Sequence, residues 1–286
     1  MSRRNRKSTR QKLSYDLDII IPVYGNFDLL QRTLDALPKA CGDKKYKVII
    51  VDNNSPDRDE YYAILKSQSL DIRILMNKEN LGYGKACNRG VSSGRSSFIL
   101  HLNSDCIMHP GSIEAMVNDM DNEEYGIVAP VLLFPSEAEY METGFDNYDF
   151  MRIRPPSRIQ HVGVETNING EFYHIFVGWS PDNPKPRKVE FPYAVSGACF
   201  LTRRSIWNTV KGFDPMYGQG TYEDIDYCLT LRKMGYNIHI VQEAVGTHYV
   251  SASAAKYNLP MPINENRQLF MNKWGNELTY SEWRYL

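Results

Sequence analysis

Carboxylates stand at two places in the chain where they can do chemistry. Asp105 ends the apolar run "FILHLNSD", and burying it costs free energy unless a backbone cap, a basic side chain or a metal ion pairs with it. Glu223, Asp224 and Asp226 follow the glycine-bearing stretch "YGQG". Acids favour the first turn of a helix, but three within four residues exceed what capping requires. His248 also follows an apolar run; its ordinary place is the surface, and the alternative is a metal ligand.

These side chains need elements that position them, and the sequence alternates between two patterns from residue 16 onward. Short β-rich apolar runs occur at 17–24, 46–55, 71–77 and 96–105. Helical patterns follow them at 27–40, 58–68, 84–94 and 112–120, the first expected to end near Pro38. Such alternation predicts an α/β fold, with a Rossmann-like parallel sheet, right-handed crossovers and helices on both faces.

Polar side chains follow four successive predicted strands, at the edge where ligands bind in parallel sheets. They are Tyr24, Asp52, Asn53, Asn54, Asn80, Asn103 and Asp105. Each alone is ordinarily a turn or capping residue. Together they predict a ligand-binding crevice.

The second half of the chain is less regular. We expect a strand at 126–134, punctuated connections with a hairpin up to about residue 190, and then a strand and a helix within 193–210. A helix should begin near Glu223 and bury Ile225, Cys228, Leu229 and residues 231–234, and short strands should follow within 237–249. We interpret residues 15–286 as one domain with a binding half (15–125) and a catalytic half with mixed strands (126–286).

Composition places the chain among globular proteins, because 42% of its residues are hydrophobic and 12% aromatic. No apolar stretch approaches the roughly 20 residues that span a bilayer, and no signal peptide is evident. Five cysteines without CxxC spacing indicate reduced thiols. We therefore expect a cytoplasmic protein, with peripheral contact to a membrane surface as a further option.

The N-terminal segment carries an unbalanced charge. Residues 3–12 hold six basic side chains and no acid, so the rest of the chain has 27 basic and 34 acidic residues, a balance of −7. A basic arm can bind nucleic acid or anionic lipid. The simpler interpretation of residues 1–14 is a solvated, disordered tail.

Several common nucleotide and hydrolase motifs are absent from the sequence. It contains no G-x-G-x-x-G at the first helix, no G-x-x-x-x-G-K-[ST] and no G-x-S-x-G. These absences argue against a dinucleotide fold of the usual kind, a P-loop NTPase and an α/β-hydrolase.

The order of the remaining motifs resembles family 2 glycosyltransferases of the GT-A fold, in particular the rhamnosyltransferase-like group. The resemblance runs from about residue 16 to 275 and excludes the basic tail. The stretch 137–157 is longer than the family suggests, so acceptor preference is not carried over. The shared segments are "IIIPVYGNFDLLQRTLDAL", "VIIVDNNSPD", "NLGYGKACNRG", "LNSD", "RIQHVGV", "AVSGACFLTRRSIWNTVKGFDPMY", "YEDIDYCLTLRKMGY" and "THYVSAS".

The resemblance implies transfer of a sugar from a nucleotide-sugar donor to a glycan or other hydroxyl-bearing acceptor, with inversion. The nucleoside would be lined by Pro22, Tyr24, Asp52 and Asn54, with Asp52 accepting from the base N–H of a uridine or thymidine nucleotide. The nucleotide floor would be shaped by Asn80, Gly82, Lys85 and Asn88, and the sugar would lie near Gly197 and Ala198.

The resemblance also implies a metal site and a base. Asp105 matches the last position of a D-x-D motif whose first position is Asn103 here, and His248 would be a second metal ligand. Hard oxygen ligands suit Mn²⁺ or Mg²⁺, which would stabilise a leaving diphosphate. Asp224 would be the catalytic base and Glu223 would orient the acceptor, although adjacent carboxylates can exchange roles; Asp226 would be structural.

Alternatives from other classes stay open at this point. A sugar nucleotidyltransferase would need a glycine- and basic-rich phosphate loop after the first strand, and "PVYGNFD" lacks one. A catalytically silent sugar-nucleotide-binding module is disfavoured by the intact acids Asp105, Glu223 and Asp224. Glycosylation of a protein or of a modified nucleic-acid base remains possible, the latter using the basic arm.

Overall fold

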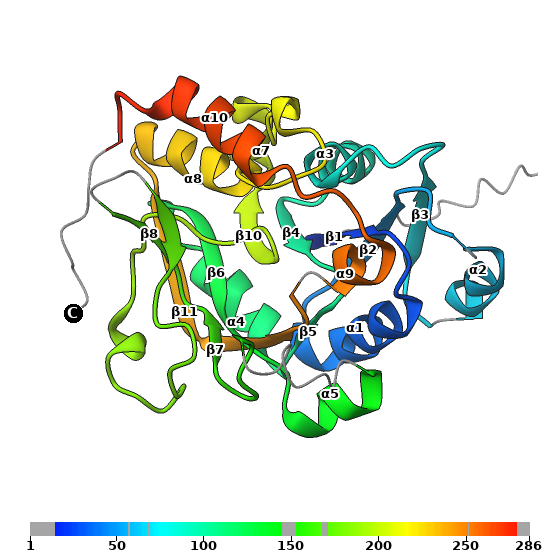
Figure 1. Ribbon diagram of the computed structural model, residues 1–286. Coiled ribbons are helices and arrows are strands. Elements are labelled where there is room, and N and C mark those ends of the chain that lie inside the picture. The colour runs from blue at the N-terminus through cyan, green and yellow to red at the C-terminus, as the bar shows by residue number, and fades with distance from the viewer. Residues whose placement is uncertain are drawn as a thin grey trace, which may run out of the picture.

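The computed structural model describes residues 15–56, 58–67, 69–144, 153–167, 171–250 and 252–278 (Figure 1). The expectations for the basic segment 3–12 and for the tail 1–14 lie outside the described residues. Part of the unusually long stretch 137–157 also lies outside them. Among the described residues, no helix combines the length and apolar character needed to cross a membrane.

The first half forms the parallel part of the sheet. Its four strands lie in the order β3-β2-β1-β4 and pair in parallel. They are β1 (Leu17–Val23), β2 (Tyr46–Asp52), β3 (Ile72–Met76) and β4 (Phe98–Leu102). The helices are α1 (Phe27–Cys41), α2 (Arg58–Ser67), α3 (Tyr83–Ser93) and α4 (Ser112–Asp119). The α/β prediction is confirmed.

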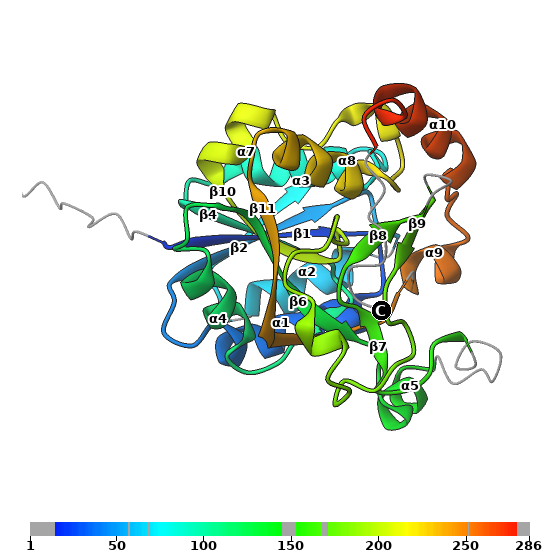
Figure 2. The same cartoon turned by 90° about the vertical axis from the view of Figure 1, so that its left-hand side faces the viewer.

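Both faces of this sheet are buried, which explains its continuous apolar strands. In β1, Ile19 and Ile21 pack with Leu34 of α1 on one face. Ile20 packs with Val91 of α3 on the other. Figure 2 shows the layers from the side, with α1 and α4 below the sheet and α3, α7 (Arg204–Val210) and α8 (Glu223–Lys233) above it.

The second half extends the sheet with mixed strands. Within the described residues the sheet has nine strands and continues from β4 in the order β10-β6-β11-β5, with β7 also paired to β6. The added strands are β5 (Cys106–Met108), β6 (Tyr125–Leu133), β7 (Ile159–His161), β10 (Cys199–Arg203) and β11 (Asn237–His248). The expected hairpin is formed by β8 (Val164–Thr166) and β9 (Phe172–His174).

Some local predictions are wrong. Helix α1 continues through Pro38 to Cys41, because a proline there removes only one N–H bond while Ala40 and Cys41 are fully buried. The expected short strands form one strand, β11, with an irregularity between Val241 and Val245. Met234 is 45% exposed rather than buried, since it caps the C-terminus of α8.

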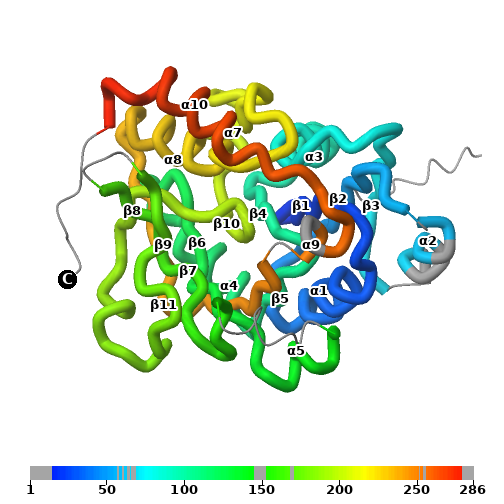
Figure 3. The backbone as a smooth tube through the Cα atoms, in the orientation of Figure 1, coloured from blue at the N-terminus to red at the C-terminus, as the bar shows by residue number. Residues whose placement is uncertain are grey.

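The remaining elements were not predicted as separate units. They are α5 (Glu137–Thr143), the short helices η1 (Pro186–Lys188) and η2 (Pro215–Tyr217), α9 (Ala252–Tyr257) and α10 (Ile263–Trp274). In Figure 3 the C-terminal chain passes from β11 through α9, beside the carboxyl end of β1, and on to α10 over α8. Residues 252–263 therefore border the edge where the polar strand ends gather.

Candidate active site

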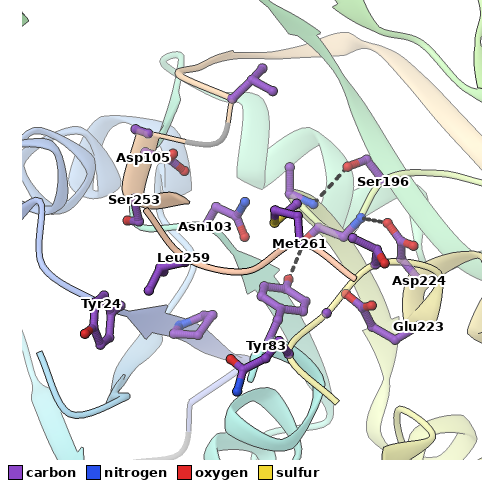
Figure 4. A pocket seen from close by; sticks show the side chains of 18 of the residues that line it. Tyr24, Tyr83, Asn103, Asp105, Ser196, Glu223, Asp224, Ser253, Leu259 and Met261 are labelled. Carbon is purple, nitrogen blue, oxygen red and sulfur yellow. Dashed lines mark hydrogen bonds between the residues drawn. The ribbon is translucent and has the colours of Figure 1, made fainter. Parts of the chain in front are cut away.

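A cavity of about 620 Å³ opens at the carboxyl ends of the parallel strands. Both halves of the chain line it, and Figure 4 shows Asp105 on one side and Glu223 and Asp224 on the other. The predicted site residues on its wall are Pro22, Tyr24, Asn80, Asn103, Asp105, Gly197, Ala198, Glu223, Asp224 and His248. The structure thus brings most of the predicted residues to one cavity.

Asp105 and His248 meet because two strands far apart in sequence pair. Strand β5 runs antiparallel to β11, with Cys106 opposite His248, and the Tyr249 amide donates to the Asp105 carbonyl at 3.1 Å. The Asp105 Oδ1 atom lies 3.4 Å from His248 Nε2. Both residues are buried.

The hydrogen bonds of His248 show which nitrogen is free to bind. Its Nδ1 lies 3.3 Å from Gln160 Oε1, an acceptor, so in the neutral ring the proton sits on Nδ1 and Nε2 has a lone pair. The Asn103 amide nitrogen donates to this Nε2 at 3.3 Å, a bond that a cation would replace. Nε2 and the carboxylate oxygen Oδ1 of Asp105 face each other across 3.4 Å, and the neutral ring offers a lone pair there.

This pair fits a divalent cation. Neighbouring ligands of an octahedral ion with bonds of about 2.1 Å lie about 3 Å apart. In the part of the chain that the structure describes, no three His, Cys, Asp or Glu side chains gather into a metal-binding group. Any cation at Asp105 and His248 would therefore need further ligands besides these two side chains.

Asp224 and Glu223 form a buried acidic pair at the start of α8. The Asp224 carboxylate accepts from the Gly197 amide at 2.8 Å and from the Ile225 amide at 2.9 Å. Burial nevertheless raises the pKa of Asp224. Glu223 Oε2 is buried and has no hydrogen-bond partner among the described residues, and burial with the adjacent Asp224 raises the pKa of Glu223 to about 8. The two backbone amides favour the charged form of Asp224 over that of Glu223.

Asp226 has a different environment from its two neighbours. Its carboxylate accepts from Tyr217 Oη at 3.2 Å and from Trp274 Nε1 at 2.5 Å. Lys273 Nζ lies 2.9 Å from the same group. These contacts attach α8 to α10, in agreement with the structural role expected for Asp226.

Five predicted residues do not line the cavity. Asp52 accepts from the Ser55 amide at 2.7 Å and from the Tyr62 hydroxyl. The Asn88 side chain bonds both backbone groups of Phe213. The other three are Asn54 and Lys85, which are exposed, and Gly82, where a Cβ would lie 2.0 Å from the Gly218 carbonyl. Their binding roles stay predictions.

Sequence reasoning gave no individual role to some cavity residues. Asn53, expected at the crevice only as one of the polar strand-end residues, lines the cavity, and its Oδ1 accepts from Asn77 Nδ2 at 2.7 Å and the Leu81 amide at 3.0 Å. Tyr83 donates from its hydroxyl to the Gly197 carbonyl. The motifs "NLGYGK" and "RIQHVGV" contained the signals for Tyr83 and Gln160.

The family model "Glycosyl transferase family 2" matches residues 18–206, about two thirds of the chain. The chain belongs to glycosyl transferase family 2. Membership of a glycosyltransferase family argues against the nucleotidyltransferase alternative.

Curated relatives agree with this family 2 assignment. The chain is 26% identical over 261 residues to the N-acetylglucosaminyl-diphospho-decaprenol L-rhamnosyltransferase of Mycobacterium tuberculosis, covering 84% of this chain and 78% of the relative. It is 25% identical over 258 residues to the O-antigen biosynthesis protein RfbC of Myxococcus xanthus, covering 85% of this chain and 18% of that protein. An uncharacterized protein of Sinorhizobium fredii is 26% identical over 250 residues, with 85% of this chain and 25% of that protein covered. The chain thus spans a quarter or less of these last two relatives.

Solved structures confirm the GT-A fold of the enzyme. A crystal structure of GalNAc-T7 with UDP, GalNAc and Mn²⁺ superposes with a TM-score of 0.70 at 13% identity, covering 95% of this chain and 53% of that one. The mannosyltransferase PcManGT from Pyrobaculum calidifontis, in complex with GDP-Man and Mn²⁺, gives a TM-score of 0.54 at 14% identity, covering 83% and 58%.

Proposed function

We propose that the enzyme is an inverting, metal-dependent hexosyltransferase that moves a sugar from a UDP- or dTDP-sugar to a hydroxyl of a glycan or glycoconjugate. One observation carries the proposal: the Asp105–His248 pair and the Asp224–Glu223 pair line the same cavity. The first is suited to a diphosphate-bound cation and the second to an acceptor hydroxyl. The sugar would lie between them.

Asp105 and His248 would hold Mn²⁺ or Mg²⁺. The cation would neutralise the charge that develops on the leaving diphosphate. Two solved GT-A structures that resemble the chain contain Mn²⁺, which supports this assignment. Gln160 would keep the His248 ring in the ligating tautomer, as outer partners of metal-bound histidines do.

Asp224 would take the proton of the acceptor hydroxyl. Inversion requires the acceptor to attack from the face opposite the diphosphate, so the base must lie across the cavity from Asp105. The two backbone amides at Asp224 hold it as the charged partner. Glu223, protonated at neutral pH, would donate to an oxygen of the acceptor and so orient it.

The preference for uridine or thymidine rests on Asp52 at the end of β2. The Asp52 carboxylate is engaged by Ser55 and Tyr62, so a base N–H would share or replace one of these bonds. Resembling structures include TarS from S. aureus in complex with UDP-GlcNAc, with a TM-score of 0.52 at 16% identity. PcManGT, with GDP-Man, shows that the fold also accepts guanosine nucleotides.

The cysteines and one curated relative support a proposal for the compartment in which the enzyme acts. All five cysteines are free and buried, which suits a reducing compartment such as the cytoplasm. The similarity to a rhamnosyltransferase named for a decaprenol-linked substrate supports peripheral association with a membrane surface. No described residue favours a protein or a nucleic acid as acceptor.

Thermal-shift and calorimetric screening of UDP-, dTDP- and GDP-sugars, with and without Mn²⁺, tests the proposal. A ligand at a hundredfold its dissociation constant adds about 2.7 kcal/mol to native-state stability, a readily measured shift. We expect the uridine and thymidine donors to bind, with Mn²⁺ strengthening them. Equal binding of GDP-sugars would contradict the nucleotide preference, and binding indifferent to Mn²⁺ would contradict the metal site.

A further inference from the structure

Two histidines at the edge of the cavity form a hydrogen-bonded pair that the mechanism above does not use. His161 ends β7 and is buried, while His174 ends β9, is exposed and lines the cavity. Their Nδ1 atoms lie 2.8 Å apart. The backbone amide of Ser196 donates to His161 Nε2 at 3.2 Å. His161 therefore has a partner at each ring nitrogen.

These contacts fix the tautomers of both rings. Because the Ser196 amide can only donate, His161 Nε2 carries no proton, and the proton of this neutral ring sits on Nδ1. His161 Nδ1–H then donates to His174 Nδ1, which leaves the His174 proton on Nε2. Burial and the neighbouring His174 also hold the pKa of His161 well below its usual value.

The pair is connected through neighbouring residues to both ends of the proposed site. His161 follows Gln160, whose amide oxygen holds His248 at the metal end. The Ser196 amide that binds His161 is followed by the Gly197 amide that binds Asp224 at the base end. In an inverting transfer the sugar must lie between the leaving diphosphate and the base. His174 lines this cavity, and its partner His161 is connected to both ends of it through Gln160 and Ser196.

We propose that His174 Nε2–H is a fixed hydrogen-bond donor for a hydroxyl oxygen of the transferred sugar, oriented by His161 and the Ser196 amide. None of the described residues accepts a hydrogen bond from this N–H, so it is available to a ligand. A donor whose direction is locked by its neighbours discriminates against sugars without an oxygen at that position, since the N–H is then left unpaired. His174 binds the sugar, and His161 is a positioning residue.

The tautomers can be tested without any substrate. The chain has six histidines, so the long-range ¹H–¹⁵N spectrum of ¹⁵N-histidine-labelled protein resolves each ring. The variants His161→Asn and His174→Gln assign the signals of these two histidines. We expect His161 to be protonated at Nδ1 and His174 at Nε2. The common Nε2–H form at His161 would overturn the inference whether or not the enzyme binds nucleotide sugars.

The sugar contact rests on the proposed function and needs a donor. Calorimetry compares UDP with UDP-glucose, UDP-galactose and UDP-GlcNAc on the wild type, His174→Leu and His174→Gln. We expect His174→Leu to weaken the best-bound UDP-sugar about three- to tenfold, the range for one hydrogen bond, and to leave UDP unchanged. His174→Gln should retain part of the affinity, because its amide accepts from His161 and still donates to the cavity.

Deoxy donors identify the hydroxyl. The UDP-sugar that lacks the contacted hydroxyl should bind the wild type and His174→Leu equally, as in a double-mutant cycle. His239→Gln is the control: His239 pairs with Asp119 and does not line the cavity, so its affinities should match the wild type. Equal loss of UDP and UDP-sugar, or no loss of either, would overturn the inference. Failure of every nucleotide sugar to bind the wild type would instead refute the proposed function.

Discussion

The backbone amide of Gly197 donates a 2.8 Å hydrogen bond to Asp224 Oδ2. The adjacent Ala198 carbonyl accepts from the Asn103 amide at 2.8 Å. Two consecutive residues thus connect the end of β4, beside Asp105, to the start of α8. The main chain of Gly197 and Ala198 therefore links the proposed metal site to the base and holds the Asp224 carboxylate in place.

Asp224→Asn should separate catalysis from donor binding. The substitution removes the basicity of the side chain, and a positioned base contributes about 10²–10⁴-fold. We expect sugar transfer to fall by that order while UDP-sugar affinity, measured by calorimetry, stays within about twofold. Asp226→Asn is the matched control, because the bonds of Asp226 to Tyr217 and Trp274 are structural. It should lower the melting temperature and change the transfer rate little. Near-normal transfer by Asp224→Asn would move the role of base to Glu223.

Asp105→Asn should remove the response to metal without unfolding the enzyme. Among the described residues no backbone N–H donates to this carboxylate, and His248 Nε2 lies 3.4 Å from it. For the wild type we expect Mn²⁺ to tighten UDP binding about tenfold or more, which is about 1.4 kcal/mol. The variant should bind UDP equally with and without Mn²⁺ and melt near the wild-type temperature. A large loss of stability would identify Asp105 as a structural residue instead.

Glu223→Gln should change how stability depends on pH. The folded-state pKa of Glu223 is raised from 4.5 to about 8 by burial and by Asp224. Between these values the folded protein binds more protons than the unfolded chain. The free energy of unfolding therefore falls as pH rises through that window, by about 1.4 kcal/mol per pH unit. The glutamine variant mimics the protonated acid and does not titrate. Its free energy of unfolding, measured with urea, should therefore rise relative to that of the wild type from pH 5 to pH 8. Parallel curves would show that Glu223 is ionised in the folded state.

Local patterns were sufficient to predict the first half of the fold. The run "LDIIIPV" is buried on both faces and forms β1, and the strand ends Tyr24 and Asn103 reach the cavity as expected. The position of His248 beside Asp105 could be predicted only from the family resemblance. Its cause is the pairing of three-residue β5 with β11, a long-range register that no local pattern contains.

Side-chain partners were harder to predict than elements. Asp52 turns to the Ser55 amide, the turn-forming use that is ordinary for aspartate, although its position suggested a nucleobase contact. The His161–His174 pair depends on how β7 and β9 are placed by Leu132 and Val164. Neither strand exceeds three residues, so propensity carries little information there.

His101 offers a test of the core beneath the site. It is fully buried against the rings of Trp207 and Phe200, and neither nitrogen has a hydrogen-bond partner among the described residues. Burial, and then Arg204, lower its pKa to about 3. Between pH 6.5 and 3 the unfolded chain binds this proton and the folded protein does not, so stability is lost as pH falls.

His101→Phe should therefore stabilise the enzyme, by up to about 1–3 kcal/mol at pH 7.5, because it removes an unpaired buried polar group. The advantage over the wild type should grow by about 1.4 kcal/mol per pH unit below 6.5. Urea unfolding at pH 7.5 and pH 5.5 measures both effects. An advantage that does not change with pH would mean that His101 is protonated inside the fold.

A side chain of helix α10 binds the loop that precedes Glu223 and Asp224. Thr221 and Tyr222 both have left-handed backbone conformations, with φ of 78° and 70°, which non-glycine residues adopt at a cost. Asn266 of α10 is buried, and its Nδ2 lies 2.8 Å from the Tyr217 carbonyl, 2.5 Å from that of Gly220 and 3.1 Å from that of Thr221.

Asn266→Ala should therefore impair catalysis through the position of Glu223 and Asp224. Without the amide the strained loop can relax, and a shift of about 1 Å in a catalytic group can cost about a hundredfold in rate. We expect kcat for donor hydrolysis to fall about ten- to a hundredfold and UDP affinity to stay unchanged, because Asn266 does not line the cavity. Gln268→Ala, an exposed position on the same helix, is the control and should behave as the wild type. A variant that loses stability but keeps its kcat would show that Asn266 serves the fold alone.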